Sequence, residues 1–146
     1  MVEAKNNKKQ SHPIHHEEIN IIEERPVLDK IETLVHKDVI EQAEMVKKIE
    51  AACLARRDDD FVIIARTDAI AVEGIEGAVK RARAYAQAGA DMLFPDAVRT
   101  EDDIKRLVDA AGIPLTINMG FGIRSRPTTP LIPLPRLKAL GVKRIS

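Results

Sequence analysis

The chain has 146 residues, with 23 basic and 23 acidic side chains, 45% hydrophobic residues and only 3% aromatic ones. This length suits one domain with an aliphatic core, and the zero net charge argues against a bulk electrostatic grip on nucleic acid or on an anionic membrane. No apolar run approaches the ~20 residues that span a bilayer, and no apolar segment follows the basic, polar first residues, so no secretory signal is expected. The single Cys53 cannot form an internal disulfide, so we expect a reduced, cytoplasmic protein.

Residues 1–18 are rich in Lys, Asn, His and Glu and have almost no apolar periodicity. We predict a disordered polar tail there, followed by one folded domain at 19–146. Three histidines of the tail, His12, His15 and His16, could form a metal cluster. A solvated tail is favoured, because no Cys or further ligand accompanies them.

The first predicted elements are a strand at 19–22 and a helix at 41–57, separated by a loop of mixed charge. Glu23 and Glu24 stand at the carboxyl end of the strand. The apolar face of the helix consists of Ala43, Val46, Ile49, Ala52 and Cys53, so Cys53 is interpreted as a packing residue. The run 58–60, three aspartates, is predicted to be a solvated turn rather than a cation site, since no EF-hand spacing surrounds it.

Three further strand and helix units follow in the chain. We predict strands at 61–65, 91–94 and 114–118, helices at 75–88, 101–111 and 135–140, and an apolar run at 142–145. Gly89 and Gly112 suit helix ends, and Thr100 suits an N-cap. This alternation predicts an α/β fold with a parallel sheet and right-handed crossovers. A doubly wound sheet and a (β/α)8 TIM barrel both fit, and four or five strands would form about half of a barrel that normally needs ~250 residues.

Polar side chains follow the predicted strands. Because the carboxyl ends of parallel strands meet at one edge, we expect these side chains to converge on one site. They are Glu23, Glu24, Arg66, Thr67, Asp68, Asp96 and Asn118. One guanidinium, several carboxylates and an amide suit a small anionic ligand with a divalent metal. The alternative for Arg66 is an internal ion pair with Asp68 or Asp96, and Asp96 and Asn118 could equally cap turns. The glycine- and arginine-rich loop at 119–130 lacks the GKS/GKT ending and the GxGxxG spacing, so no nucleotide site is expected.

The segments "ARTDA", "RARAYAQAGAD" and "FPDA" occur in order, and "INMGFGIRSRPTTPLI" follows them. Together they resemble the isocitrate lyase and phosphoenolpyruvate mutase superfamily, most closely its methylisocitrate lyase, dimethylmalate lyase, oxaloacetate decarboxylase and carboxyphosphonoenolpyruvate mutase branch. The resemblance covers residue 39 to the end. It implies a partial (β/α)8 barrel, Mg2+ dependence and assembly into a homo-oligomer. It also implies cleavage or formation of a C–C or P–C bond beside an α-keto acid through an enolate.

The resemblance implies that Arg66, Asp96 and Asn118 bind a small dicarboxylate or keto acid. The family often has glutamate at the Asp96 position. Glu23 is the one candidate metal ligand, because the upstream strands that carry the family's Mg2+-binding aspartates have no counterpart here. The lysine, cysteine and histidine of the lyase loop fall on Asp29, Ile31 and Thr33, so no catalytic residue is assigned. We therefore expect a lyase-like protein that is weakly active or inactive alone, with a phosphorylmutase or a non-catalytic half-barrel as alternatives.

Overall fold

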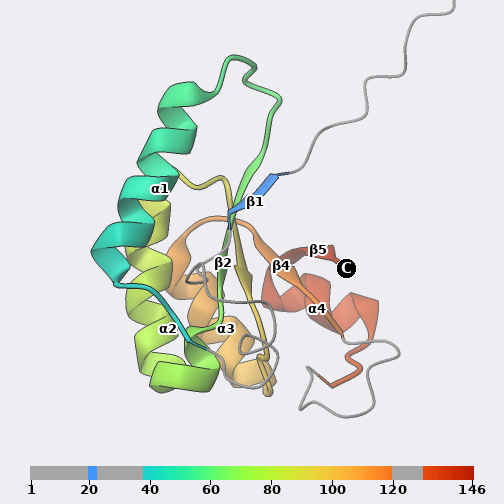
Figure 1. Ribbon diagram of the computed structural model, residues 1–146. Coiled ribbons are helices and arrows are strands. Elements are labelled where there is room, and N and C mark those ends of the chain that lie inside the picture. The colour runs from blue at the N-terminus through green and yellow to red at the C-terminus, as the bar shows by residue number, and fades with distance from the viewer. Residues whose placement is uncertain (1–19, 23–37, 120–129) are drawn as a thin grey trace, which may run out of the picture.

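The computed structural model describes residues 20–22, 38–119 and 130–146. Strands and helices alternate along these segments (Figure 1). The elements are β1 (Asn20–Ile22), α1 (Gln42–Ala55), β2 (Ile63–Thr67), α2 (Ala69–Gln87), β3 (Met92–Pro95), α3 (Glu101–Ala111), β4 (Leu115–Ile117), α4 (Leu134–Leu140) and β5 (Val142–Ile145). None of the helices in these segments is long and apolar enough to cross a membrane. The predicted tail at 1–18 and the loop after β1 lie outside the described residues.

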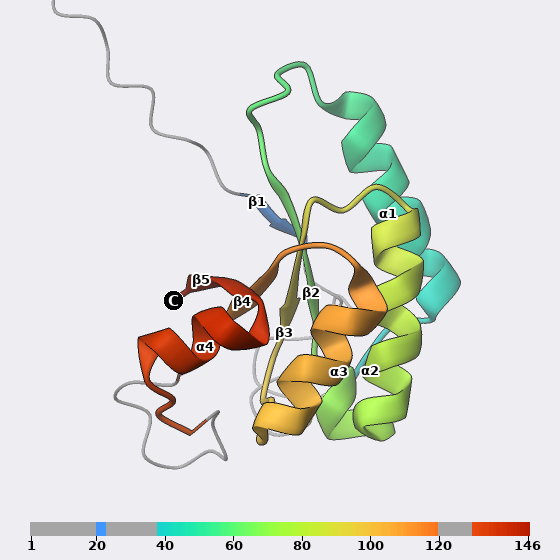
Figure 2. The same ribbon diagram turned by 180° about the vertical axis from the view of Figure 1, so that it is seen from behind.

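The five strands form one parallel sheet in the order β1-β2-β3-β4-β5. Each crossover therefore moves to the next strand in the same direction, and right-handed crossovers then place every helix on the same face. Consecutive helices are neighbours, α1 beside α2, α2 beside α3 and α3 beside α4 (Figures 1 and 2). A doubly wound sheet would reverse its strand order at a switch point. The open alternative is thus settled as a partial (β/α)8 barrel.

The core lies between the sheet and this single helical layer. Alternate residues of the inner strands, such as Ala65, Leu93 and Leu115, pack against helix residues such as Ile49, and all are fully buried. Because successive strand side chains point to opposite faces, the residues between them lie on the other face of the sheet. We call this the inner face, since it corresponds to the interior of a closed barrel.

Several predicted boundaries shift in the structure. The predicted strand at 61–65 is β2 at Ile63–Thr67, so Arg66 lies inside the strand and not after it. The segment before residue 75, predicted to be a loop, is helical from Ala69, and α2 kinks at Gly74, whose φ is 74°. A turn of helix ahead of a glycine has too few residues to show a helical period. The N-cap Thr100 is confirmed, since its side chain accepts a 3.1 Å hydrogen bond from Asp103 N.

The buried face of α1 differs from the predicted one. Met45 and Ile49 are fully buried, whereas Ala43 is exposed. The helix, predicted to run to residue 57, ends at Ala55, and Arg56 directly after it pairs with Asp91 at 2.7 Å. Because Asp91 Oδ2 also accepts a bond from Ile63 N at 2.8 Å, this pair ties the end of α1 to the start of β2.

Candidate functional site

Strand β2 carries Arg66 on the inner face of the sheet, because its neighbour Ala65 belongs to the helix-facing core. The strand begins with fully buried isoleucines, and only 17% of the arginine side chain is exposed. Arg66 is near the carboxyl end of this buried parallel strand, and ligands of α/β barrels bind at the carboxyl ends of the strands. The predicted position of Arg66 on the ligand side of the sheet is therefore consistent with the fold.

The guanidinium of Arg66 is surrounded by two carboxylates and one ring. Its Nη2 lies 3.2 Å from Asp68 Oδ1 and 3.5 Å from Asp96 Oδ2. Its Cζ lies 5.3 Å from the centroid of the Phe94 ring. The internal ion pair considered from the sequence is thus present with both partners. These contacts fix the position of the planar guanidinium.

Backbone contacts bring the ends of β2 and β3 together around this arginine. Asp96 N donates to Thr67 O at 2.9 Å, and Thr67 Oγ1 accepts from Ala69 N at 3.1 Å. Asp68 is the N-cap of α2, but its carboxylate makes no cap bond and instead accepts from Arg66. Ala97, directly after Asp96, has φ of 61°, an unusual value for a residue with a side chain. Strained backbone of this kind is concentrated at functional sites.

The other predicted site residues are placed less fully. Asn118 follows β4 directly and is half-buried. It is two strands away from Arg66, or ~10 Å across the sheet. Glu23 and Glu24 lie outside the described residues, as does most of the loop after Met119.

The described residues do not fit the Mg2+ that the family resemblance implies. No three His, Cys, Asp or Glu side chains among them are grouped so as to hold a metal ion. Asp68 and Asp96 both contact the same guanidinium, which competes with a cation for their oxygens. The three aspartates of the turn at 58–60 are exposed, and Asp58 Oδ1 accepts from Asp60 N at 2.9 Å, as predicted for a turn.

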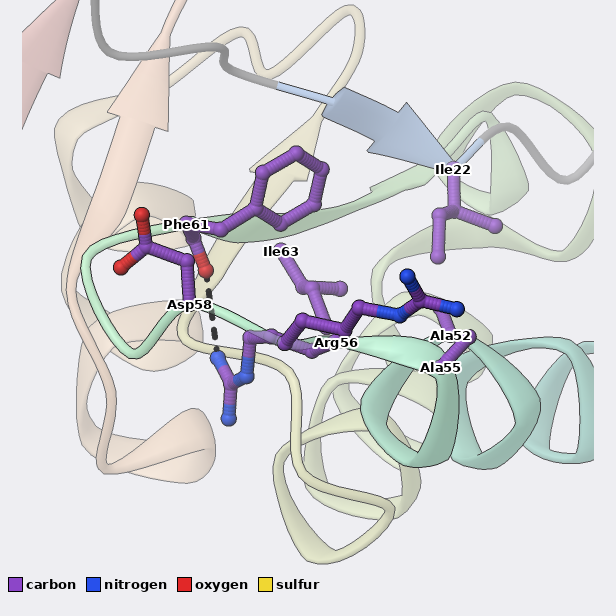
Figure 3. Close-up of a pocket in the computed structure, with 8 residues that line it drawn as sticks. Ile22, Ala52, Ala55, Arg56, Asp58, Phe61 and Ile63 are labelled. Atoms are coloured by element: carbon purple, nitrogen blue, oxygen red, sulfur yellow. Dashed lines mark hydrogen bonds between the residues drawn. The ribbon is translucent and has the colours of Figure 1, made fainter. Parts of the chain in front are cut away.

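A separate apolar pocket lies at the opposite end of β2 (Figure 3). It has a volume of about 560 Å³, and its walls come from the end of α1 and the start of β2. Ala52, Ala55 and Ile63 contribute to these walls, and Arg56 Nη1 donates to Phe61 O at 3.3 Å. The pocket is at the amino end of β2, with Ile22 of β1 also in its lining, so it is distinct from the site around Arg66.

Phe94 contacts Arg66 but was not among the site residues predicted from the sequence. It pairs with Arg66 in the β2–β3 register, and 6% of the residue is exposed. The signal was available in the alternation of the run 92–95, where Phe94 and the core residue Leu93 must face opposite sides. An aromatic face under a guanidinium stabilises the cation and limits its rotation.

Comparisons with known proteins give one consistent result. A family model described as "Phosphoenolpyruvate phosphomutase" matches residues 20–146. The 2-methylisocitrate lyase of Salmonella typhimurium (strain LT2) is 45% identical over 108 residues, which cover 73% of this chain and 35% of that protein. The 2,3-dimethylmalate lyase of Eubacterium barkeri is 37% identical over 120 residues, 82% of this chain and 40% of that protein. The chain thus spans well under half the length of these relatives.

Solved structures of the same superfamily match the fold. A 2,3-dimethylmalate lyase structure, described as a PEP mutase/isocitrate lyase superfamily member, has a TM-score of 0.72 at 32% identity and covers 86% of this chain and 41% of that one. Oxaloacetate acetylhydrolase in complex with the product oxalate has a TM-score of 0.70 at 30% identity, covering 86% and 41%. A phosphonopyruvate hydrolase complex with oxalate and Mg2+ has a TM-score of 0.63 at 27% identity, covering 86% and 42%.

The sheet order and these matches agree with the resemblance of the sequence motifs. The chain belongs to the phosphoenolpyruvate phosphomutase family, within the PEP mutase/isocitrate lyase superfamily.

Proposed function

We propose that this chain supplies the substrate-binding half of a methylisocitrate lyase-like carbon–carbon bond lyase acting on small hydroxy or keto acids with several carboxylates. The observation that carries the proposal is Arg66, a nearly buried guanidinium at the carboxyl end of β2 that two carboxylates and a ring hold in place. A fixed guanidinium is suited to a carboxylate or to the oxyanion of an enolate, because its planar fork matches two oxygens.

Asp96 and Asn118 complete the proposed substrate site. Asp96 contacts the Arg66 guanidinium, and Asn118 directly follows β4, which is separated from β2 by β3. Oxalate in the related oxaloacetate acetylhydrolase and phosphonopyruvate hydrolase structures supports a small dianionic ligand for this family. Glu23 remains our proposal for a metal ligand, with the further ligands coming from outside the described residues. The neutral charge and single cysteine support a cytoplasmic location.

A second candidate function is a non-catalytic half-barrel that binds such acids weakly. The observation that favours it is the loop sequence, in which Asp29, Ile31 and Thr33 stand where the family resemblance places the lysine, cysteine and histidine of the lyases. A phosphorylmutase is the third possibility, supported by the description of the matching family model. We expect little or no pyruvate release from methylisocitrate by this chain alone in a coupled assay. Robust turnover would identify an active lyase and rule out the other two functions.

Calorimetric titration of the chain with oxalate, in the presence of Mg2+, tests the proposed binding site. We expect wild-type protein to bind and Arg66→Met to lose about 10- to 100-fold in affinity, as for a lost hydrogen bond to a charged group. The matched control is Arg136→Met, which removes an exposed arginine that pairs with Glu101 on the surface. It should bind like wild type. Failure of the wild-type chain to bind oxalate, or equal binding by Arg66→Met, would contradict the proposal.

A further inference from the structure

A second arginine, Arg144, lies in the same row of the sheet as Arg66. In the strand register Arg66 pairs with Phe94, and Thr116 pairs with Arg144. Leu93 pairs with Leu115, so Phe94 and Thr116 are neighbours one position further along. The row therefore runs from β2 to β5 through one residue of each strand. Leu93 and Leu115 belong to the helix-facing core, so Phe94 and Thr116 lie on the inner face. A register shift between Leu115 and Thr116 leaves Lys143 without a partner on β4, so Arg144 lies opposite Thr116 although Val142, two residues earlier, packs in the helix-facing core.

The contacts of Arg144 support this placement. Its Nη1 donates to Thr116 Oγ1 at 3.2 Å, and Thr116 is completely buried. Arg144 itself is half-buried. Its side chain is thus directed along the sheet toward β4. The partner of its guanidinium there is the neutral hydroxyl of Thr116.

The two arginines differ in how their charge is balanced. Arg66 lies within 4.0 Å of two carboxylates. In the part of the chain that the structure describes, no carboxylate oxygen lies that close to Arg144. A partly buried guanidinium with a neutral partner keeps most of its attraction for an anion, because its charge is neither paired nor fully hydrated.

The distance between the ends of the row suits a molecule with two acidic groups. Three strand spacings separate the backbones of β2 and β5, or ~14 Å along the sheet. A barrel sheet is concave on its inner face, so long side chains from the two ends turn toward each other. A ligand that reaches both guanidinium groups needs carboxylates at its two ends, joined by a short carbon chain.

We propose that Arg144 binds the second carboxylate of the substrate, so that the site selects four-carbon and longer dicarboxylates over shorter acids. This inference rests on the proposed function, because it takes Arg66 as the contact for the first carboxylate. Arg144 acts here as a specificity residue, and it takes no part in bond cleavage. No residue at this strand was among the sequence-predicted site residues.

Titration with two probes, oxalate and succinate, tests the inference. Oxalate is too short to span the row, whereas succinate carries its carboxylates on a four-carbon chain. We expect Arg144→Met to weaken succinate binding by about 10- to 100-fold, as for a lost charged hydrogen bond, and to change oxalate binding less than twofold. Arg66→Met should weaken both. Lys143→Met, an exposed neighbour on the same strand, is the matched control and should bind both probes like wild type.

Arg144→Lys keeps the charge and covers the possibility that Arg144→Met does not fold. Lysine lacks the planar fork, so succinate affinity should fall between those of wild type and Arg144→Met. Unchanged succinate affinity in both Arg144 variants, with oxalate still bound through Arg66, would overturn this inference and leave the proposed function intact. If the wild-type chain does not bind oxalate, both this inference and the proposed function are overturned.

Discussion

Arg81 is a nearly buried cation that joins α2 to the segment ahead of α1 and links the two sides of the kink in α2. Its Nε and Nη2 donate to the two carboxylate oxygens of Glu73 at 2.9 and 2.6 Å. Its Nη1 donates to Ile40 O, ahead of α1, at 2.9 Å and to the hydroxyl of Tyr85 at 3.1 Å. Because Glu73 precedes the kink at Gly74 and Arg81 follows it, the pair holds the first turn of α2, and with it the end of β2, in place.

Replacing Glu73 with Gln should destabilise the chain by about 1–3 kcal/mol, because Arg81 would stay buried with a neutral partner. The hydrogen bond from Arg81 lowers the pKa of Glu73 below its ordinary value of 4.5. A lowered folded-state pKa adds stability that is present above the unfolded-state pKa and is lost as pH falls through the folded-state value. The difference between wild type and Glu73→Gln in urea unfolding should therefore be full at about pH 6 and shrink below pH 4.5.

Glu76→Gln is the matched control for this measurement. Glu76 is on the same helix and pairs with Arg106, but 77% of its side chain is exposed. Exposed pairs contribute about 0–1 kcal/mol, so this variant should unfold close to wild type. A pH-independent difference between wild type and Glu73→Gln would show that the ionised carboxylate is not the source of the stability.

At the residue scale, the sequence predicts contacts between residues that stand at the same end of neighbouring parallel strands. The proximity of Arg66 and Asp96 was predictable because each stands near the carboxyl end of a predicted strand, and the carboxyl ends of parallel strands lie side by side. The bond from Arg81 to Ile40 O joins residues 41 positions apart in the sequence. Nothing in the run "RARAYAQAGAD" distinguishes a buried cation from a solvated one, so this contact was not predictable.

The junction of α4 with β5 shows a constraint on an element end. Gly141 is the left-handed residue that ends α4, with φ of 96°. A Cβ on this residue would lie 2.8 Å from Cγ1 of Val108 on α3. Two requirements therefore apply here, a conformation that suits glycine and a close approach between neighbouring elements.

Gly141→Ala should cost about 2–5 kcal/mol, the sum of left-handed strain and overpacking. Gly112→Ala is the matched control, since Gly112 also ends a helix with φ of 66° but has nothing within 4 Å of the added Cβ. It should cost only the strain, about 1–2 kcal/mol. Adding Val108→Ala to Gly141→Ala should recover part of the difference. Equal losses for the two glycine variants, measured by urea unfolding, would rule out the contact with Val108.

At the element scale, the order and type of the described elements follow from the alternation of apolar runs and helical periods. Boundaries followed less well, and β2 shows why. The apolar run begins at Phe61, but the carboxylate of Asp91 accepts from Ile63 N, and Arg56 donates to Phe61 O. These side chains occupy backbone groups at the start of the run, and the strand begins only at Ile63. Both contacts come from outside the run, so its own residues could not fix where the strand begins.

At the scale of the whole molecule, the pattern of strands and helices left the choice between a doubly wound sheet and a barrel open, and the family resemblance predicted the barrel that the structure confirms. Strand and helix alternation is the same in both, and only the direction of successive crossovers separates them. The sequential order of β1 to β5 fixes that direction and puts all helices on one face. Among the described elements, a sheet wound in one direction leaves an inner face without helices and leaves β1 and β5 with a neighbour on one side only.

We expect the 146-residue chain to self-associate, because open parallel edges and exposed apolar residues pair readily with other chains. Leu131, Leu134 and Ile145 are 68%, 63% and 36% exposed. Static light scattering should give at least twice the 16.2 kDa chain mass, rising with concentration. Ile145→Lys, on the edge strand β5, should lower the mass, since a charged edge opposes pairing. Leu54→Lys, at an 87% exposed position on α1, is the matched control and should not. A compact, soluble monomer at high concentration would contradict this expectation.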